Sequence, residues 1–353
     1  MKRRFLTLMI ATLFLATFTI GCGKNQEAVC RDSENYSITE ETIPLEATLQ
    51  SEKFDTSRYY YNQLTEESKL IYDKVINSKE DFIENRSVVV GSIDGEHGLD
   101  MKKAEKILVP AINAYYMDNP ESTMWINGYA FTLDPIIKFT DDGDYDCIER
   151  FDIIIQPMEQ TGKYADFESP EETRAALEKI NQLTEEFVKN LSGSDEEKLK
   201  AIHDWILKDA TYDETKSKAN IRNVYGALVQ KDCVCAGFAY AFKYVADAAG
   251  LQVITVTGEG FSGNTSEPHA WNLMYCDEKW TLTDVTWDVN GRYEVIDEKV
   301  ETEEYIDENG NLVVIESYTP ITEKVSSYSY FAKPLEETTD SHIPDEMFEI
   351  PSK

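Results

Sequence analysis

The clearest periodic segment of the chain predicts a helix after residue 234. Apolar residues recur there with the spacing of one helical face, at Phe238, Phe242, Val245 and Ala249. Gly250 follows where a helix would end. Cys235 therefore lies at the helix N-terminus, where amide groups and the helix dipole favour an anion and can lower a thiol pKa from ~8.5 to about 3.5–7.5. The pattern predicts a thiolate at neutral pH.

Two β-rich runs follow, and their pairing predicts that a histidine and an aspartate lie together. If Cys276 and Lys279 flank a two-residue turn, Asp284 lies opposite Trp271 and is the diagonal neighbour of His269. Their side chains then share one face, roughly 7–8 Å apart at Cα. A slip of one residue would place them on opposite faces. The turn would contain an Asp-Glu pair, which is unfavourable because Glu rarely adopts a positive φ.

These segments resemble the core of the transglutaminase-like superfamily, which has a papain-like fold. The motifs are CAGFA at 235–239, HAWN at 269–272 and WTLTDVTW at 280–287. The resemblance implies that Cys235 is the nucleophile, His269 the base and Asp284 the residue that orients the base. It also implies an α+β fold in which the catalytic helix packs on an antiparallel sheet. Glu278 departs from the family pattern, which commonly has Gly there, and this puts the turn in doubt rather than the triad.

Neighbouring residues leave several alternatives open. Trp271 shares the face of His269, so we expect it to bind substrate, whereas Asn272 points the other way and is expected to be structural. Cys233 is either passive or forms a strained disulfide that masks Cys235. A zinc site of three cysteines and His269 lacks Cys-x-x-Cys pairs, so neither a metal nor a cofactor is expected.

The region before this core predicts a separate α+β unit. Thr65 and Asp100 begin helices, and β-rich runs cover 123–131, 135–139 and 145–156. Two helices then begin at Ser169 and Ser194, and a Glu three residues later, Glu172 or Glu197, is expected to complete a capping box in each. The second contains His203, expected to be structural because it cannot pair with its helix neighbour Asp204. After residue 288, short β-like runs at 293–296 and 312–318 precede a closing segment, 328–331 and His342, that also resembles the family.

We therefore divide the chain into an α+β N-terminal region at 57–164, a transglutaminase-like domain at 165–345 and a tail at 346–353. Residues 1–21 read as a lipoprotein signal peptide, because basic residues precede an apolar run too short for the ~20 residues of a membrane helix. Cys22 follows a lipoprotein-like box and is expected to be acylated; secretion without lipid and a retained anchor are the alternatives. Residues 22–56 are polar and predict a flexible tether.

The net charge argues against a nucleic-acid-binding function, and the cysteine count is consistent with a reactive thiol. The net charge is −32, and removal of residues 1–21, which contain three basic and no acidic residues, makes it −35. Such a surface repels nucleic acid, so no nucleic-acid partner is expected. Of six cysteines, lipidation of Cys22 leaves an odd number and hence an unpaired thiol.

The sequence thus predicts a lipid-anchored, extracytoplasmic protein of the bacterial cell membrane that performs acyl transfer on amide or peptide bonds through a thioester. Protein or peptide substrates, including cell-envelope peptides, are the expected partners, together with the bilayer through acylated Cys22. By the resemblance, hydrolysis is favoured over cross-linking. The alternative is a non-catalytic surface binding module on the same fold.

Overall fold

The computed structural model describes residues 55–95, 98–126, 128–141, 143, 145–157, 166–262, 265–289, 293–306, 312–324 and 327–351. The expected signal peptide, Cys22 and nearly all of the expected tether lie outside these residues. Among the described helices, none is long and apolar enough to span a membrane.

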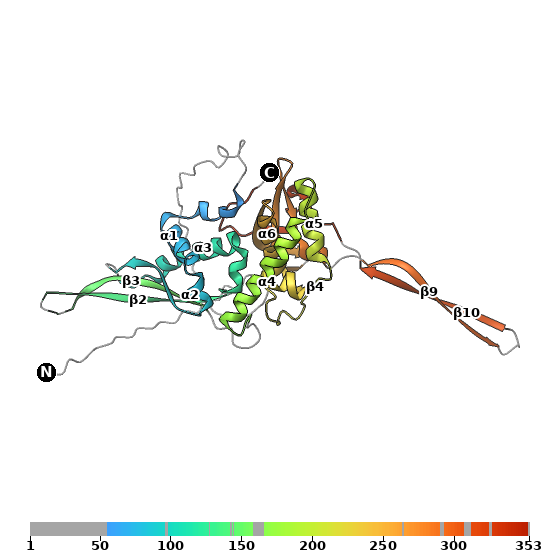
Figure 1. Cartoon of the computed structure of the whole chain (residues 1–353), viewed down its shortest axis with the longest axis horizontal. Helices are drawn as coiled ribbons and strands as arrows, with labels where there is room; N and C mark the ends of the chain where they lie inside the picture. The colour runs from blue at the N-terminus through green and yellow to red at the C-terminus, as the bar shows by residue number, and fades with distance from the viewer. Residues whose placement is uncertain are drawn as a thin grey trace.

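The N-terminal region is an antiparallel three-stranded sheet, in the order β1-β3-β2, packed with helices (Figure 1). Its elements are α1 (Glu66–Ile76), α2 (Lys79–Ile83), β1 (Val88–Asp94), α3 (Met101–Asp118), β2 (Tyr129–Phe139) and β3 (Tyr145–Pro157). Thr65 and Asp100 cap α1 and α3 as predicted, each side chain accepting a backbone N–H of the first turn. The expected division into three β runs was wrong: residues 120–124 form a 3₁₀ helix, and the later two segments belong to β2 and β3.

The second half combines helices with an antiparallel five-stranded sheet of order β11-β8-β7-β6-β12. Its helices are α4 (Pro170–Lys189), α5 (Asp195–Leu207), α6 (Cys235–Ala248) and α7 (Val285–Val289). Its strands are β4 (Thr211–Tyr212), β5 (Asp232–Cys233), β6 (Gln252–Ser262), β7 (Thr265–Cys276), β8 (Lys279–Thr283), β9 (Tyr293–Ile306), β10 (Leu312–Lys324), β11 (Lys333–Pro334) and β12 (His342–Pro344). Helix α6 packs against β6 and β7, so the overall architecture is α+β as predicted.

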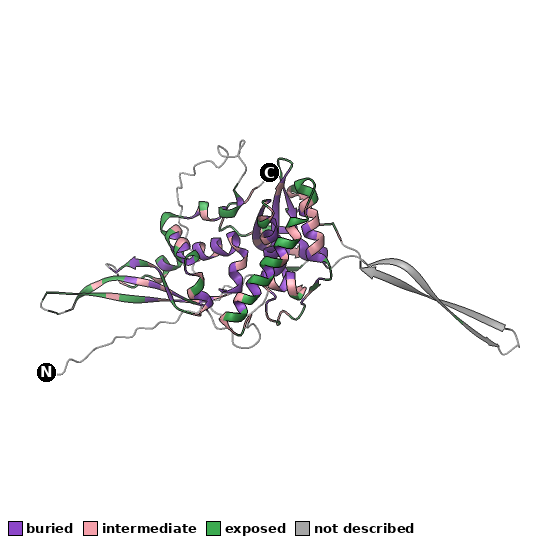
Figure 2. Ribbon diagram, viewed as in Figure 1, coloured by how far each residue is buried: buried purple, intermediate pink, exposed green. Residues whose placement is uncertain are grey.

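Two long hairpins extend from opposite ends of the molecule (Figure 1). The β2–β3 hairpin belongs to the N-terminal region, and β9–β10 projects from the second half. The sequence predicted only short β-like runs where β9 and β10 form a continuous antiparallel ribbon. Buried segments, purple in Figure 2, include much of α3, α6 and the five-stranded sheet.

Helix caps explain where α4 and α5 begin. Ser194 and Glu197 form the predicted capping box: Glu197 N–H donates to Ser194 Oγ at 3.2 Å, and Ser194 N–H donates to Glu197 Oε2 at 2.8 Å. Ser169 caps α4 in the same way. The return bond predicted for Glu172 differs, because its carboxylate accepts the N–H of Glu168 instead.

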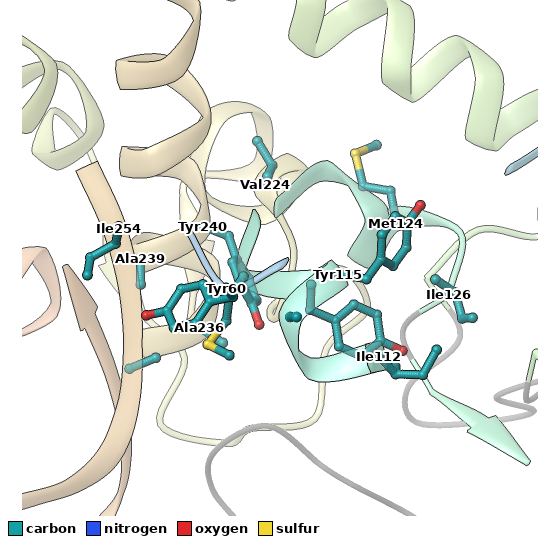
Figure 3. Packing of buried hydrophobic residues seen from close by; sticks show 14 of the residues in the cluster. Tyr60, Ile112, Tyr115, Met124, Ile126, Val224, Ala236, Ala239, Tyr240 and Ile254 are labelled. Carbon is teal, nitrogen blue, oxygen red and sulfur yellow. The ribbon is translucent and has the colours of Figure 1, made fainter. Parts of the chain in front are cut away.

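The hydrophobic core runs from the N-terminal region into the second half without interruption. Tyr60 and Tyr240 lie side by side where the two halves meet, with Tyr115 and Ile112 of α3 beyond them (Figure 3). The Tyr60 hydroxyl donates to the carbonyl of Thr255 in β6. The N-terminal region therefore packs against the sheet that carries the predicted site and supports it.

Candidate active site

The β7–β8 hairpin has the register that the sequence predicted. Cys276 pairs with Lys279, and Asn272 pairs with Thr283. Asp277 and Glu278 form the two-residue turn with φ of 50° and 62°, so the pair adopts the left-handed conformation that a tight hairpin needs despite its unfavourable residue types. One detail differs. Strand β8 ends at Thr283, so the last part of the 280–287 motif forms α7 rather than strand.

This register brings His269 and Asp284 into direct contact. His269 Nε2 lies 2.7 Å from Asp284 Oδ2. An ionised carboxylate only accepts hydrogen bonds, so Nε2 must carry a proton. The neutral imidazole then has its lone pair on Nδ1, the nitrogen that can exchange a proton with a thiol.

Asp284 is fixed from several directions. Its Oδ1 accepts the N–H groups of Thr286 at 2.9 Å and Trp287 at 3.2 Å, at the start of α7. Its own N–H donates to the carbonyl of Tyr330 at 2.9 Å. Burial alone would raise the pKa of this carboxyl, but electrostatic attraction to His269 and His342 and their hydrogen bonds outweigh burial and hold the pKa well below its usual range. Asp284 is therefore an anion at neutral pH.

Cys235 is the first residue of α6, as predicted. Val234 precedes it, and a valine side chain cannot accept a hydrogen bond, so it does not cap the first-turn amides with a polar group. The dipole of α6 favours a thiolate at this position. Asn272 ties the strand of His269 to this helix, because its Nδ2 donates to the carbonyl of Ala239 at 3.0 Å. Asn272 thus has the structural place expected of it.

Aromatic rings enclose the histidine. The rings of Trp271 and Trp287 lie 6.0 Å and 5.5 Å from that of His269, both nearly parallel to it. Trp271 is only 2% exposed, and its expected contact with substrate stays a prediction. Trp287 is only half-buried and packs against His269. The three-residue spacing from Asp284, at the start of a short helix, is the signal that could have placed Trp287 there.

Comparison with known proteins identifies the fold around these residues. Residues 181–285 match the model of the transglutaminase-like superfamily. This segment forms a transglutaminase-like domain core. A curated relative is the kyphoscoliosis peptidase of Mus musculus, 31% identical over 121 residues, which are 31% of this chain and 18% of that protein. Its Homo sapiens counterpart is 32% identical over 107 residues, 27% of this chain and 16% of that protein. The chain thus spans less than a fifth of either relative.

Solved structures with similarity include two bacterial proteins. A putative cysteine protease from Cytophaga hutchinsonii is 14% identical, with a TM-score of 0.27, and the match covers 59% of this chain and 82% of that one. The periplasmic domain of TgpA from Pseudomonas aeruginosa, bound to ethylmercury, is 18% identical, with a TM-score of 0.27, over 44% of this chain and 65% of that one.

A second histidine from outside the matched segment also contacts Asp284. His342 Nε2 lies 3.2 Å from the same oxygen, Oδ2. The sequence placed His342 in a closing segment that resembles the family but assigned it no role in the site. The ligand-type atoms of His269, Asp284 and His342 lie within 4.8 Å of one another, a combination that suits a divalent metal. The two N···O distances are also those of hydrogen bonds, which satisfy the carboxylate without an ion.

The second half of the chain contains another buried His-Asp pair. His203 Nε2 lies 3.1 Å from Asp288 Oδ2, and both side chains are fully buried. Asp288 also accepts the N–H of Tyr330 at 3.1 Å. The pair joins α5, α7 and the 327–332 segment, which agrees with the structural role expected of His203. The reason given for that expectation was wrong, because His203 Nδ1 also lies 3.4 Å from Oδ1 of its helix neighbour Asp204.

None of the described cysteines forms a disulfide. Cys147 is exposed, whereas Cys233, Cys235 and Cys276 are buried. Burial raises the pKa of the Cys233 thiol, and this sulfur lies 3.0 Å from the position that a Cβ would take on Gly237. Cys233 is therefore packed against the first turn of α6 as a neutral thiol, and redox control of Cys235 stays a prediction.

A cavity of about 440 Å³ borders His269. It lies between β6, the N-terminal region and the 345–350 segment. Aromatic and apolar side chains line it together with three carboxylates, Glu259, Asp345 and Glu346, and its described lining includes neither Lys nor Arg. Such a cavity suits a neutral or cationic group with an apolar part.

Proposed function

We propose that this protein is a lipid-anchored, extracytoplasmic cysteine hydrolase that cleaves amide or peptide bonds through a thioester. The observation that carries the proposal is the 2.7 Å contact between His269 and Asp284 in the same domain core as a cysteine that begins a helix. A base oriented by a buried carboxylate and a thiol at a helix N-terminus are the parts of a thiol acyl-transfer site.

The reaction begins with proton transfer from the Cys235 thiol to His269 Nδ1. The thiolate attacks the carbonyl carbon, forming a C–S bond, and amides at the start of α6 stabilise the oxyanion. The C–N bond then breaks, and the imidazolium gives its proton to the departing amine. Asp284 holds the Nε2–H tautomer and stabilises the imidazolium meanwhile. A thioester on Cys235 and a free amine result.

Water completes the cycle. His269 takes a proton from the water as its oxygen attacks the thioester carbon, the C–S bond breaks, and the thiolate and a carboxylic acid are released. If a Lys amine attacks instead, the product is an isopeptide cross-link. We favour hydrolysis, with envelope peptides as substrates, because the sequence resembles lipid-anchored bacterial members of the family.

Substrate access sets a condition on this proposal. The exposed fractions of Cys235, His269 and Asp284 are 0%, 4% and 0%, so the reacting groups are covered in the described conformation. The cavity beside His269 could hold part of a substrate. Entry of a peptide carbonyl to Cys235 requires neighbouring segments to move apart.

Alkylation tests the nucleophile directly. The full chain, purified in detergent and reduced, is treated with iodoacetamide between pH 4 and 9, and the alkylated cysteines are mapped by mass spectrometry. We expect Cys235 to react at a pH where Cys276, whose pKa burial raises to about 11, does not. Reaction of Cys235 with the pH dependence of an ordinary thiol would reject the enzyme and favour the binding module.

A second assay separates hydrolysis from cross-linking. Envelope peptides are incubated with the chain, with and without a fluorescent primary amine. New peptide termini or released ammonia indicate hydrolysis, whereas amine incorporation indicates transfer. Cys235→Ala should abolish either product.

The lipid anchor is tested separately. Cells that express the chain are labelled with a palmitate analogue, and the label should be lost in Cys22→Ala.

A further inference from the structure

His342 reaches the site from the end of the chain. It begins β12, which adds to the outer edge of β6 with His342 opposite Gly260 and Pro344 opposite Gly258. The family match ends at residue 285, so this strand is not part of the matched core. Even so, its first side chain is buried within the domain and contacts Asp284.

Two glycines make this approach possible. A Cβ on Gly258 would lie 2.1 Å from the carbonyl oxygen of Ile343, and a Cβ on Gly260 would lie 3.0 Å from His269 Cβ. Real Cβ atoms essentially never approach as closely as the first distance, and the second is tighter than nine in ten real Cβ contacts. Strand β6 therefore lacks side chains at the two positions where β12 and the His269 ring pack against it.

The contacts of Asp284 show what His342 contributes. Two backbone amides donate to Asp284 Oδ1, whereas Asp284 Oδ2 contacts the Nε2 atoms of His269 and His342. Because the ionised carboxylate accepts only, His342 Nε2 must donate a proton to Oδ2, as His269 Nε2 does. The other nitrogen of His342 lies 2.9 Å from Ser341 Oγ, which holds the ring in that orientation.

We propose that His342 is a positioning residue for the thiol site: its hydrogen bond fixes the plane of the Asp284 carboxylate, so that Oδ2 orients His269 toward Cys235. This inference rests on the proposed function but adds a residue to it. Without His342, Oδ2 keeps one partner, and the carboxylate can twist about its Cβ–Cγ bond. The imidazolium is then less well stabilised, and so is the thiolate it pairs with.

The test compares three variants of the full chain in detergent. His342→Leu removes the donor at similar volume, His342→Gln keeps an N–H donor near the position of Nε2, and Ser341→Ala removes the partner of Nδ1. For each, the rate of Cys235 alkylation by iodoacetamide is measured from pH 4 to 9. We expect the pH midpoint of Cys235 alkylation to rise by on the order of one pH unit in His342→Leu. It should rise less in Ser341→Ala, and in His342→Gln it should lie close to the wild-type value.

NMR provides a readout that does not depend on the thiol. The chain has four histidines, so ¹³C-labelled imidazoles can be assigned by single substitutions. In wild type, the His269 resonance should report the Nε2–H tautomer, and in His342→Leu it should show a mixture of tautomers. Should His342→Leu fail to fold, Ser341→Ala and His342→Gln still give the comparison.

The outcomes separate this inference from the proposed function. An unchanged or lower midpoint in a folded His342→Leu, or equal shifts in His342→Leu and His342→Gln, would overturn the positioning role. A low midpoint in wild type that rises in His342→Leu supports the role even if no amide is ever turned over. Loss of melting temperature with an unchanged alkylation profile would show that His342 serves only to dock β12.

Discussion

Asp284 and Asp288 lie one helical turn apart, and each holds a different buried histidine. The N–H of Asp288 donates to the carbonyl of Asp284 at 3.2 Å, so both belong to the same short turn. Asp284 contacts His269, while Asp288 contacts His203 at 3.1 Å. One turn of helix thus supports both the candidate reactive pair and a structural pair.

This relationship offers a matched comparison. Asp284→Asn keeps the side-chain shape but removes the charge and the acceptor that selects the His269 tautomer, so we expect amide turnover to fall by on the order of 10³ to 10⁴. Asp288→Asn should lower the melting temperature and leave the pH midpoint of Cys235 alkylation in place. Turnover is measured with the peptide assay and stability by circular dichroism. Equal loss of turnover in both variants would argue against the distinction.

Replacement of the nucleophile should separate activity from stability. Cys235→Ala removes one sulfur atom from a buried position, and we expect a loss of about 1 kcal/mol in the free energy of unfolding, with no turnover. Cys233→Ala removes the same atom two residues earlier and should keep turnover. Urea titration and the peptide assay measure the two effects. Turnover by Cys235→Ala would refute the mechanism, and its loss in Cys233→Ala would give Cys233 a role in the chemistry.

The docking of β12 can be tested through its glycine. Gly258→Ala introduces a Cβ 2.1 Å from the carbonyl oxygen of Ile343, so β12 must shift and carry His342 away from Asp284. We expect the alkylation midpoint of Cys235 to rise as in His342→Leu. The control is Ile343→Ala, because that side chain is 48% exposed and points away from the site. A wild-type profile for Gly258→Ala would mean that His342 does not need β12 in place.

The raised pKa of buried Asp118 should make the stability of the fold depend on pH. Burial raises its pKa from 3.8 to about 7, against the lowering effect of the N–H groups of Tyr60 and Tyr61. The folded chain therefore binds more protons than the unfolded chain between about pH 4 and 7, so this group's stabilising contribution is full below that window and falls as pH rises through it.

The comparison is with Asp118→Asn, whose amide does not titrate. From pH 5 to 8 the melting temperature of wild type should fall relative to that of the variant, by roughly 2–4 °C for each kcal/mol lost. Differential scanning calorimetry at several pH values measures the difference. A constant difference across this range would show that the Asp118 pKa is close to its usual value.

Local patterns in the sequence determined a large part of this structure. The start of α6 at Cys235, the caps at Thr65, Asp100 and Ser194, and the register that joins His269 to Asp284 depend on interactions within a few residues or across one hairpin. Such interactions act between neighbours in the chain, so residue type and spacing are enough to predict them.

Only the tertiary structure decided which distant groups complete the site. His342 lies 58 residues beyond Asp284, and nothing in its own neighbourhood indicates the strand edge it joins. Three other features likewise depend on how separate elements pack: the half-buried position of Trp287, the cavity beside His269 and the hydrogen bond from Tyr60 to Thr255. Long-range packing is set by the fit of whole surfaces, with contributions from many residues at once, and no single segment encodes it.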